Sequence, residues 1–167
     1  MKSLIRTLLL SVLIFTVGCG GKAIRLNPEA NKVVSKKILA LWGTDLKDKG
    51  KKFDVNFFIK NESDYPITFS VWEMSCAKGD VEGTVQHHFF NAGKKQLDMP
   101  AKTIKNYRFA CLLGDKVEEG DHKIMVNNVY DTSKDKPKLV IEKAVWVAEK
   151  GFHDSTNSKD SGEKTSN

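Results

Sequence analysis

The clearest strand pattern in the chain is Phe53-Asp54-Val55-Asn56-Phe57-Phe58-Ile59. Apolar and polar side chains alternate along it, so that Phe53, Val55, Phe57 and Ile59 share one face, which is typical of a half-buried β-strand. Turn-forming residues fill the next segment, 61–66, and the alternation resumes at Ile67. Two strands joined by a tight turn are therefore expected at this point of the chain.

The same pattern recurs on both sides of this stretch. Apolar alternation between turn signals predicts further strands at 38–42, 67–76, 85–90, 107–113, 124–130 and 138–147. The alternation changes phase at Val71-Trp72, which predicts a bulge, after which Trp72, Met74 and Cys76 share a face. About seven short strands, with no convincing amphipathic helix, predict an all-β chain folded as an antiparallel β-sandwich.

Two motifs refine this fold prediction. The segment Asn61-Glu-Ser-Asp-Tyr-Pro-Ile67 resembles the N-x-S-x-x-P-I bend of bacterial immunoglobulin-like domains, and Glu119-Gly-Asp-His-Lys-Ile-Met-Val126 resembles their last strands, with His122 where Tyr is usual. The resemblance implies an immunoglobulin-like sandwich over residues 36–148. A lipocalin-like barrel is the alternative, but it needs more and longer strands than this segment supplies.

The N-terminus, MKSLIRTLLLSVLIFTVGCG, has the pattern of a secretion signal. Two cations, Lys2 and Arg6, precede an apolar run that ends at Val17, and Gly18 and Cys19 follow. The run is too short for a permanent membrane span, which needs about 20 apolar residues. We therefore expect residues 1–18 to form a signal helix that is removed from the mature protein.

The end of this leader, Thr16-Val17-Gly18-Cys19, resembles the lipobox of bacterial lipoproteins. Gly18 and Cys19 match that pattern, whereas Thr16 replaces the usual Leu. The resemblance implies cleavage before Cys19, a diacylglycerol thioether on its sulfur and an N-acyl chain such as palmitate. Gly20, where an Asp would favour inner-membrane retention, points to the outer membrane. A signal peptide without lipid, or an uncleaved anchor, is the alternative.

Composition divides the mature chain into three parts. Residues 19–35 are polar and predict a lipidated tether, residues 36–148 hold the sandwich, and residues 149–167 are polar enough to predict a disordered tail. The net charge of +6 includes two cations of the leader. The remaining charge is small for a nucleic-acid-binding protein, so no nucleic acid partner is expected.

No constellation for catalysis or metal binding emerges. His87 and His88 are neighbours and would point to opposite faces of a strand, and neither has ligand spacing to His122. Cys111, His122 and Met125 follow the order of a blue-copper site, but the acidic loop between the first two is too long. No G-x-S-x-G motif occurs. We expect no metal, no cofactor and no enzymatic activity.

Four aromatic residues fall on outward parities or at strand edges: Trp42, Phe58, Phe90 and Trp146. Gathered on one sheet, they would form a surface for a partner or ligand. The alternative is that both faces of the strands are buried in places, or that flanking segments cover these side chains.

Two further cysteines, Cys76 and Cys111, remain once Cys19 carries lipid. Export to an oxidising compartment favours a disulfide between them. Two separate buried thiols, acting as small apolar side chains, are the alternative.

These observations predict a bacterial envelope lipoprotein that is held at the membrane through Cys19 and has a binding or structural sandwich. Its partner would be another envelope protein. The alternative function is a carrier or chaperone for a small apolar ligand or for another envelope protein. An open apolar cavity would favour the carrier, and a solid core with an exposed aromatic sheet would favour the binding module.

Overall fold

The computed structural model describes residues 21–86 and 95–148. Within these residues the chain forms eleven β-strands and one short 3₁₀ helix. They are β1 (Lys22–Arg25), β2 (Val33–Ser35), β3 (Leu39–Asp48), β4 (Lys52–Asn61), β5 (Ile67–Ser70), η1 (Val71–Glu73), β6 (Ser75–Lys78), β7 (Val81–Gln86), β8 (Gln96–Met99), β9 (Ile104–Leu112), β10 (His122–Asp131) and β11 (Lys138–Val147). In this part of the chain no helix is long and apolar enough to cross a membrane.

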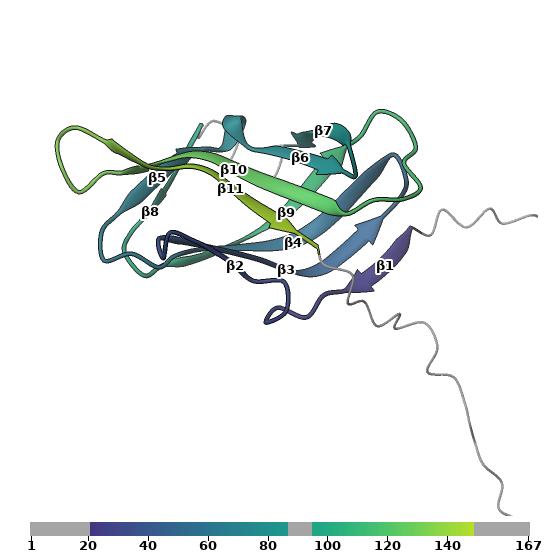
Figure 1. Ribbon diagram of the computed structural model, residues 1–167, viewed down its shortest axis with the longest axis horizontal. Helices are drawn as coiled ribbons and strands as arrows, with labels where there is room; N and C mark the ends of the chain where they lie inside the picture. The colour runs from purple at the N-terminus through teal and green to yellow at the C-terminus, as the bar shows by residue number, and fades with distance from the viewer. Residues whose placement is uncertain (1–20, 87–94, 149–167) are drawn as a thin grey trace, which may run out of the picture.

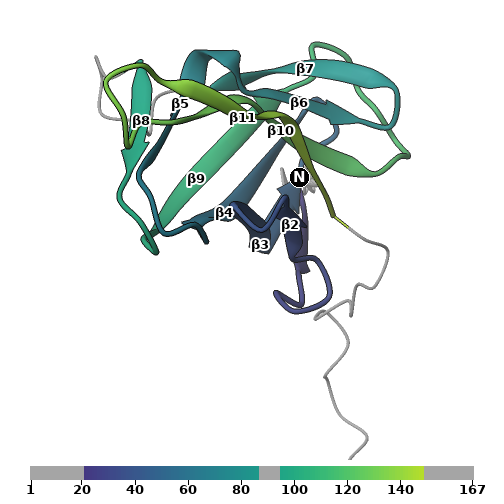
Figure 2. The same cartoon turned by 60° about the vertical axis from the view of Figure 1, so that its left-hand side comes forward.

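The strands lie in two layers that face each other, as Figures 1 and 2 show. We call the layer of β1, β3, β4 and β9, with β2 added along β3, sheet A. Sheet B contains β8, β5, β10 and β6, with β11 on the other side of β10. Every strand pair is antiparallel, so the predicted all-β antiparallel fold is confirmed, although eleven strands replace the predicted seven.

The core lies between the two sheets. Phe53, Val55, Phe57 and Ile59 of β4 are all fully buried, as their alternation predicts. The ring of Phe57 meets Phe109 of sheet A edge to face, with ring centroids 5.3 Å apart. Burial of each large apolar side chain contributes about 1.5–3 kcal/mol, so this contiguous cluster is the main source of stability.

Strand β7 passes from one layer to the other. Its first half pairs with β6 of sheet B and its second half, from Thr84, pairs with β9 of sheet A. Gly83 lies at the crossing, where an added Cβ would be 2.5 Å from the sulfur of Cys111 and 2.7 Å from the carbonyl oxygen of Leu112. The crossing therefore requires glycine, because no side chain fits between the two layers there.

A disulfide ties the layers together beside this crossing. Cys76 of β6 and Cys111 of β9 are bonded, with their Cα atoms 6.1 Å apart. Both residues are buried in the core. The predicted pairing is confirmed, and it links the two sheets at the place where β7 also joins them.

The bend after β4 is built as its motif predicts. The side-chain amide of Asn61 donates hydrogen bonds to the carbonyl oxygens of Tyr65, Met99 and Pro100, at 2.8, 3.1 and 3.1 Å. Its carbonyl oxygen accepts from the backbone N–H and the hydroxyl of Ser63. Asn61 thus satisfies the backbone groups of two adjacent turns from a buried position.

The tether predicted over 19–35 is wrong for most of its length. From Lys22 onward this segment belongs to the domain, because β1 and β2 both pair with β3. Ile24 and Leu26 are buried in the core despite the polar composition around them. Its buried residues, Ile24, Leu26 and Asn31, alternate with exposed polar ones, so the average composition of the segment does not reveal that it belongs to the fold.

The bulge predicted at Val71-Trp72 is also wrong. The chain makes the 3₁₀ turn η1 there, and β5 and β6 on either side pair with different parts of β10. Trp72, predicted to share a face with Met74 and Cys76, is 60% exposed on this turn, whereas Met74 and Cys76 are buried. In a 3₁₀ helix side chains repeat every three residues, not every two as in a strand. The alternating pattern of the sequence therefore does not predict which side chains this turn exposes.

Strand β8 was not expected from the pattern. It is only four residues long, and Leu97 and Met99 are its buried side chains. The leader 1–18, Cys19, His87, His88, Phe90 and the tail 149–167 lie outside the described residues.

Candidate functional site

The outward side of sheet A carries an aromatic pair. Trp42 of β3 and Phe58 of β4 are directly opposite each other in the ladder, and their rings stack with centroids 5.2 Å apart and planes 4° apart. Both side chains are partly exposed, because the residues beside them in each strand point into the core. Val34 of β2 and Ile104 of β9, which are 50% and 55% exposed, lie on the same side. We call these four residues the aromatic face.

Cations border the aromatic face. The ammonium group of Lys32 lies 5.6 Å from the centre of the Trp42 ring, in range for a cation–π interaction. Glu62 accepts ion pairs from Lys32 at 3.6 Å and from Lys60 at 2.9 Å. Stacking uses one face of each ring, and the remaining ring surface lies beside exposed aliphatic side chains.

A shallow hollow of about 570 Å³ lies on the outward side of sheet A. Its side chains have mixed charge, and the outward-facing ones are Ala23, Arg25, Asp45, Lys47, Asp54, Asn56 and Arg108. An exposed apolar area beside a shallow hollow that carries charged side chains is the arrangement of a surface that contacts a partner rather than one that encloses a substrate.

The predicted aromatic surface is thus present in part. Trp42 and Phe58 are brought together, Phe90 lies outside the described residues, and the outward position predicted for Trp146 is wrong. Trp146 is fully buried, meets Phe57 edge to face at 5.2 Å, and donates its indole N–H to the side-chain oxygen of Asn31 at 2.9 Å.

The reason is an irregularity between β10 and β11. Val126 and Val129 of β10 are both buried although they are three residues apart, and Asn128 between them has a positive φ of 51°. The pairing register is unbroken from Lys123 to Val129, so β11 changes parity at the same place, and Ala144 and Trp146 face inward after Ile141. This change of parity places Trp146 in the core.

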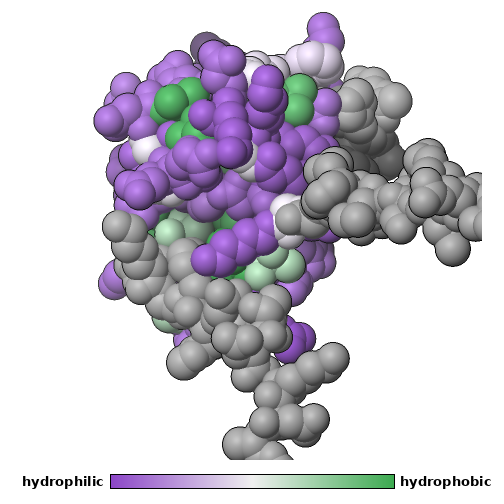
Figure 3. All heavy atoms as spheres, turned by 90° about the vertical axis from the view of Figure 1, so that its right-hand side faces the viewer, coloured by the Kyte–Doolittle hydropathy of each residue, from purple (hydrophilic) through white to green (hydrophobic). Residues whose placement is uncertain are grey.

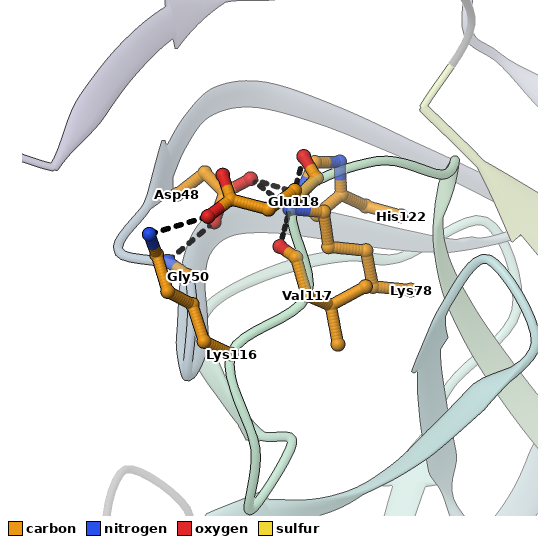
Figure 4. Close-up of polar contacts among 7 residues, drawn as sticks. All are labelled: Asp48, Gly50, Lys78, Lys116, Val117, Glu118 and His122. Carbon is orange, nitrogen blue, oxygen red and sulfur yellow. Dashed lines mark hydrogen bonds and ion pairs between the residues drawn. The ribbon is translucent and has the colours of Figure 1, made fainter.

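A buried ionic cluster closes the end of the sandwich where β3 meets β4 (Figure 4). It consists of Asp48 at the end of β3, Lys78 at the end of β6 and His122 at the start of β10. One carboxylate oxygen of Asp48 accepts from the Lys78 ammonium at 2.7 Å and lies 3.0 Å from Nε2 of His122. The other accepts from the backbone N–H of Gly50 at 2.8 Å.

Lys78 is the most buried member, at 2% exposure. Its ammonium group also donates to the carbonyl oxygens of Val117 and Glu118, so that three oxygens match its three N–H donors. The cluster therefore fastens the β3–β4 turn and the 114–121 loop to the two sheets. Because all three N–H donors of Lys78 are engaged, this side chain holds the turn and the loop in place.

Burial and charge oppose each other in this cluster. Burial disfavours the charged ring and lowers the pKa of His122, although the carboxylate of Asp48 acts in the other direction. Burial alone would raise the pKa of Asp48, but the hydrogen bonds from Lys78 and Gly50 and the nearby cations bring it below its ordinary value. The lowered pKa values of Asp48 and His122 both make the stability of the fold depend on pH.

Stability should fall as the solution becomes acidic. Because His122 binds a proton more weakly in the folded than in the unfolded chain, the free energy of unfolding is expected to decrease as the pH drops below the ordinary value of 6.5. The lowered pKa of Asp48 adds a further loss at lower pH. Urea unfolding at pH 7 and pH 5 measures the first effect. His122→Gln should flatten the difference between the two pH values, and an unchanged difference in this variant would assign the effect elsewhere.

The other residues singled out in the sequence were considered as metal ligands. In residues 21–86 and 95–148, no group of three His, Cys, Asp or Glu side chains is placed to hold a metal ion. Cys111 forms the disulfide, so it has no thiolate to offer to copper beside His122 and Met125.

The ionic cluster could not be recognised from the sequence pattern. Its members are far apart in the chain, with Asp48 separated from Lys78 by 30 positions and from His122 by 74. One signal was available: in Cys76-Ala77-Lys78, the lysine shares the parity of a core cysteine. A lysine on the inward parity of a strand needs a buried counter-charge.

Comparison with known proteins gives one structural similarity. No protein-family model matches the chain. No curated protein matches it either. A solved structure of a candidate lipoprotein, ycdA, from Bacillus subtilis is similar with a TM-score of 0.44 and 11% sequence identity, and the match covers 70% of this chain and 38% of that chain. This chain therefore spans less than half the length of that protein.

Proposed function

We propose that this chain is a lipid-anchored protein of a bacterial envelope, held at the outer membrane through Cys19. Its sandwich serves a binding or structural role and has no catalytic activity. The observation that carries the proposal is the leader, in which a basic start and an apolar run end at Gly18-Cys19.

The fold is compatible with an anchor at this position. Strand β1 begins at Lys22, so only Gly20 and Gly21 separate the domain from Cys19. Three Cα–Cα steps join Cys19 to Lys22, so the two residues are at most about 10.5 Å apart, at about 3.5 Å per residue. A lipidated Cys19 would therefore hold the sandwich directly at the membrane surface, with several acyl chains for durable attachment.

The interior of the fold supports a binding or structural role over that of a carrier. Large side chains fill the space between the sheets, and those that are fully buried include Phe53, Phe57, Phe69, Phe109 and Trp146. The aromatic face, in contrast, is accessible on the outward side of sheet A. These features are those of a solid module that meets its partner through a surface.

Replacing Cys19 tests the anchor. Cys19→Ser should accumulate as an uncleaved precursor or leave the membrane fraction, because serine has no thiol for the thioether. Thr16→Leu, which restores the usual lipobox residue, is the matched control and should be processed at least as well as the original chain. Fractionation and immunoblotting measure both. Normal processing and membrane retention of Cys19→Ser would contradict the proposal.

A further inference from the structure

Five lysines surround the point where the chain enters the domain: Lys22, Lys47, Lys49, Lys51 and Lys52. We call them the basic corner. Lys22 starts β1 opposite Asp48 in the ladder, and the other four lie in and beside the β3–β4 turn. Figure 3 shows this end of the molecule, whose described surface is mostly hydrophilic.

The backbone before β1 lies directly against this turn. A Cβ added to Gly21 would be 2.4 Å from the carbonyl oxygen of Asp48 and 2.5 Å from Cγ of Lys49. This contact leaves no room for a side chain, and it fixes where the chain leaves the domain toward Cys19. A lipid anchor on Cys19 would thus bring the β3–β4 turn, and no other end of the sandwich, to the membrane surface.

The two carboxylates beside these lysines, Asp48 and Asp54, are both paired with cations. Asp48 is occupied by the buried Lys78 and by His122. Asp54, whose side chain is 9% exposed, pairs with Lys49 at 2.7 Å and with Lys52 at 3.5 Å. Of the five lysines, Lys22, Lys47 and Lys51 are exposed and make no ion pair within the described residues. The corner therefore keeps a positive charge toward solvent.

The neighbouring 114–121 loop has the opposite character. It carries Asp115, Glu118, Glu119 and Asp121, and it touches the turn where Val117 N–H donates to the carbonyl oxygen of Gly50 at 3.2 Å. Lys116 pairs with Glu118 on this loop. An anionic surface would attract the basic corner and repel the loop, so the domain would tilt with the turn toward the surface.

We infer that the basic corner rests on anionic phospholipid headgroups and sets the orientation of the anchored domain. This inference depends on the anchor proposed above. Each lysine near an anionic surface strengthens association about fivefold, an effect that salt screens. The acyl chains would supply attachment, and the basic corner would direct the β10–β11 turn and its lysines, Lys134 and Lys136, away from the bilayer.

Amine labelling of the membrane-bound protein tests this orientation. The full lipidated chain is reconstituted into vesicles of phosphatidylcholine alone or with about one quarter phosphatidylglycerol, and treated with a water-soluble acetylating reagent. Mass spectrometry then gives a labelling rate for each lysine. Lys22, Lys47, Lys49 and Lys51 should react about fivefold more slowly in the anionic vesicles, and about 0.5 M NaCl should abolish this protection. Lys134 and Lys136 should react equally in both.

Paired variants supply the control. Lys47→Gln with Lys51→Gln should restore fast labelling of Lys22 and Lys49 in anionic vesicles, whereas Lys134→Gln with Lys136→Gln, the same loss of charge, should not. Equal labelling of the basic corner in both vesicle types, with an acylated Cys19 in the same spectra, would overturn the inference alone. An unacylated Cys19 would overturn the anchor proposal and, with it, this inference.

Discussion

Removal of the disulfide by Cys76→Ala together with Cys111→Ala is expected to lower the free energy of unfolding by about 3–4 kcal/mol. The bond joins residues 35 apart in sequence, so it restricts a long loop of the unfolded chain. It also links sheets A and B at the strand crossing, beside the glycine where β7 passes between the layers. Urea unfolding of the oxidised chain and the double variant measures the difference.

Reduction supplies a second measurement on the unchanged sequence. The reduced protein should unfold at nearly the same urea concentration as the double variant, because both lack the same constraint. Cys19→Ser, which leaves the bridge intact, is the control for cysteine substitution and should keep the stability of the oxidised chain. A loss below about 1 kcal/mol in the double variant would contradict the role assigned to the bridge.

Replacing Asp48 by Asn is expected to cost about 3 kcal/mol, the second largest effect of a substitution. The change leaves the ammonium of Lys78, which is 2% exposed, without its carboxylate. Lys78→Met removes that charge and should cost less in the Asp48→Asn variant than in the original chain, because it then eliminates an unpaired buried charge. Denaturant unfolding of the four proteins gives the coupling energy as a double-mutant cycle.

A pair that is less buried provides the matched control for this cycle. Lys60 and Glu62 lie 2.9 Å apart with side chains 28% and 23% exposed. The same cycle with Lys60→Met and Glu62→Gln should give a coupling below about 1 kcal/mol. Equal coupling energies for the two pairs would show that burial does not set the strength of the Asp48–Lys78 interaction.

The strands with long alternation could be predicted from the sequence because burial repeats there every second residue. In β4 all four predicted inward residues are in the core, and in β9 Phe109 and Cys111 are as well. The disulfide followed from compartment and from the count of available thiols. The strands follow from the local alternation of side chains, and the disulfide follows from the compartment that the leader indicates. Both signals can be found in a single sequence.

Features set by contacts between distant segments could not be predicted. The placement of β1 depends on pairing with β3, which its own four residues do not specify. Trp146 is a core residue because β11 changes parity opposite Asn128, which lies on another strand. The ionic cluster required Asp48, Lys78 and His122 to meet from three strands. In each case the cause is long-range geometry, for which alternation carries no signal.

Three of these features lie together at the end of the sandwich where β1 begins. The basic corner, the ionic cluster and the start of β1 lie at one end of the sandwich. Asp48 connects them, because its carboxylate holds Lys78 and His122 while its carbonyl oxygen lies against Gly21. A cluster that stiffens the end nearest the proposed anchor would keep the orientation of the aromatic face constant relative to the membrane.

The most direct test of the central claim, lipid attachment at Cys19, is the mass of the N-terminal peptide of the mature protein. Protein is isolated from the membrane fraction, digested and measured by mass spectrometry. The account predicts a peptide that begins at Cys19 and carries a diacylglyceryl group together with an N-acyl chain. A peptide that begins at Met1, or one that begins at any residue without lipid on Cys19, would contradict it.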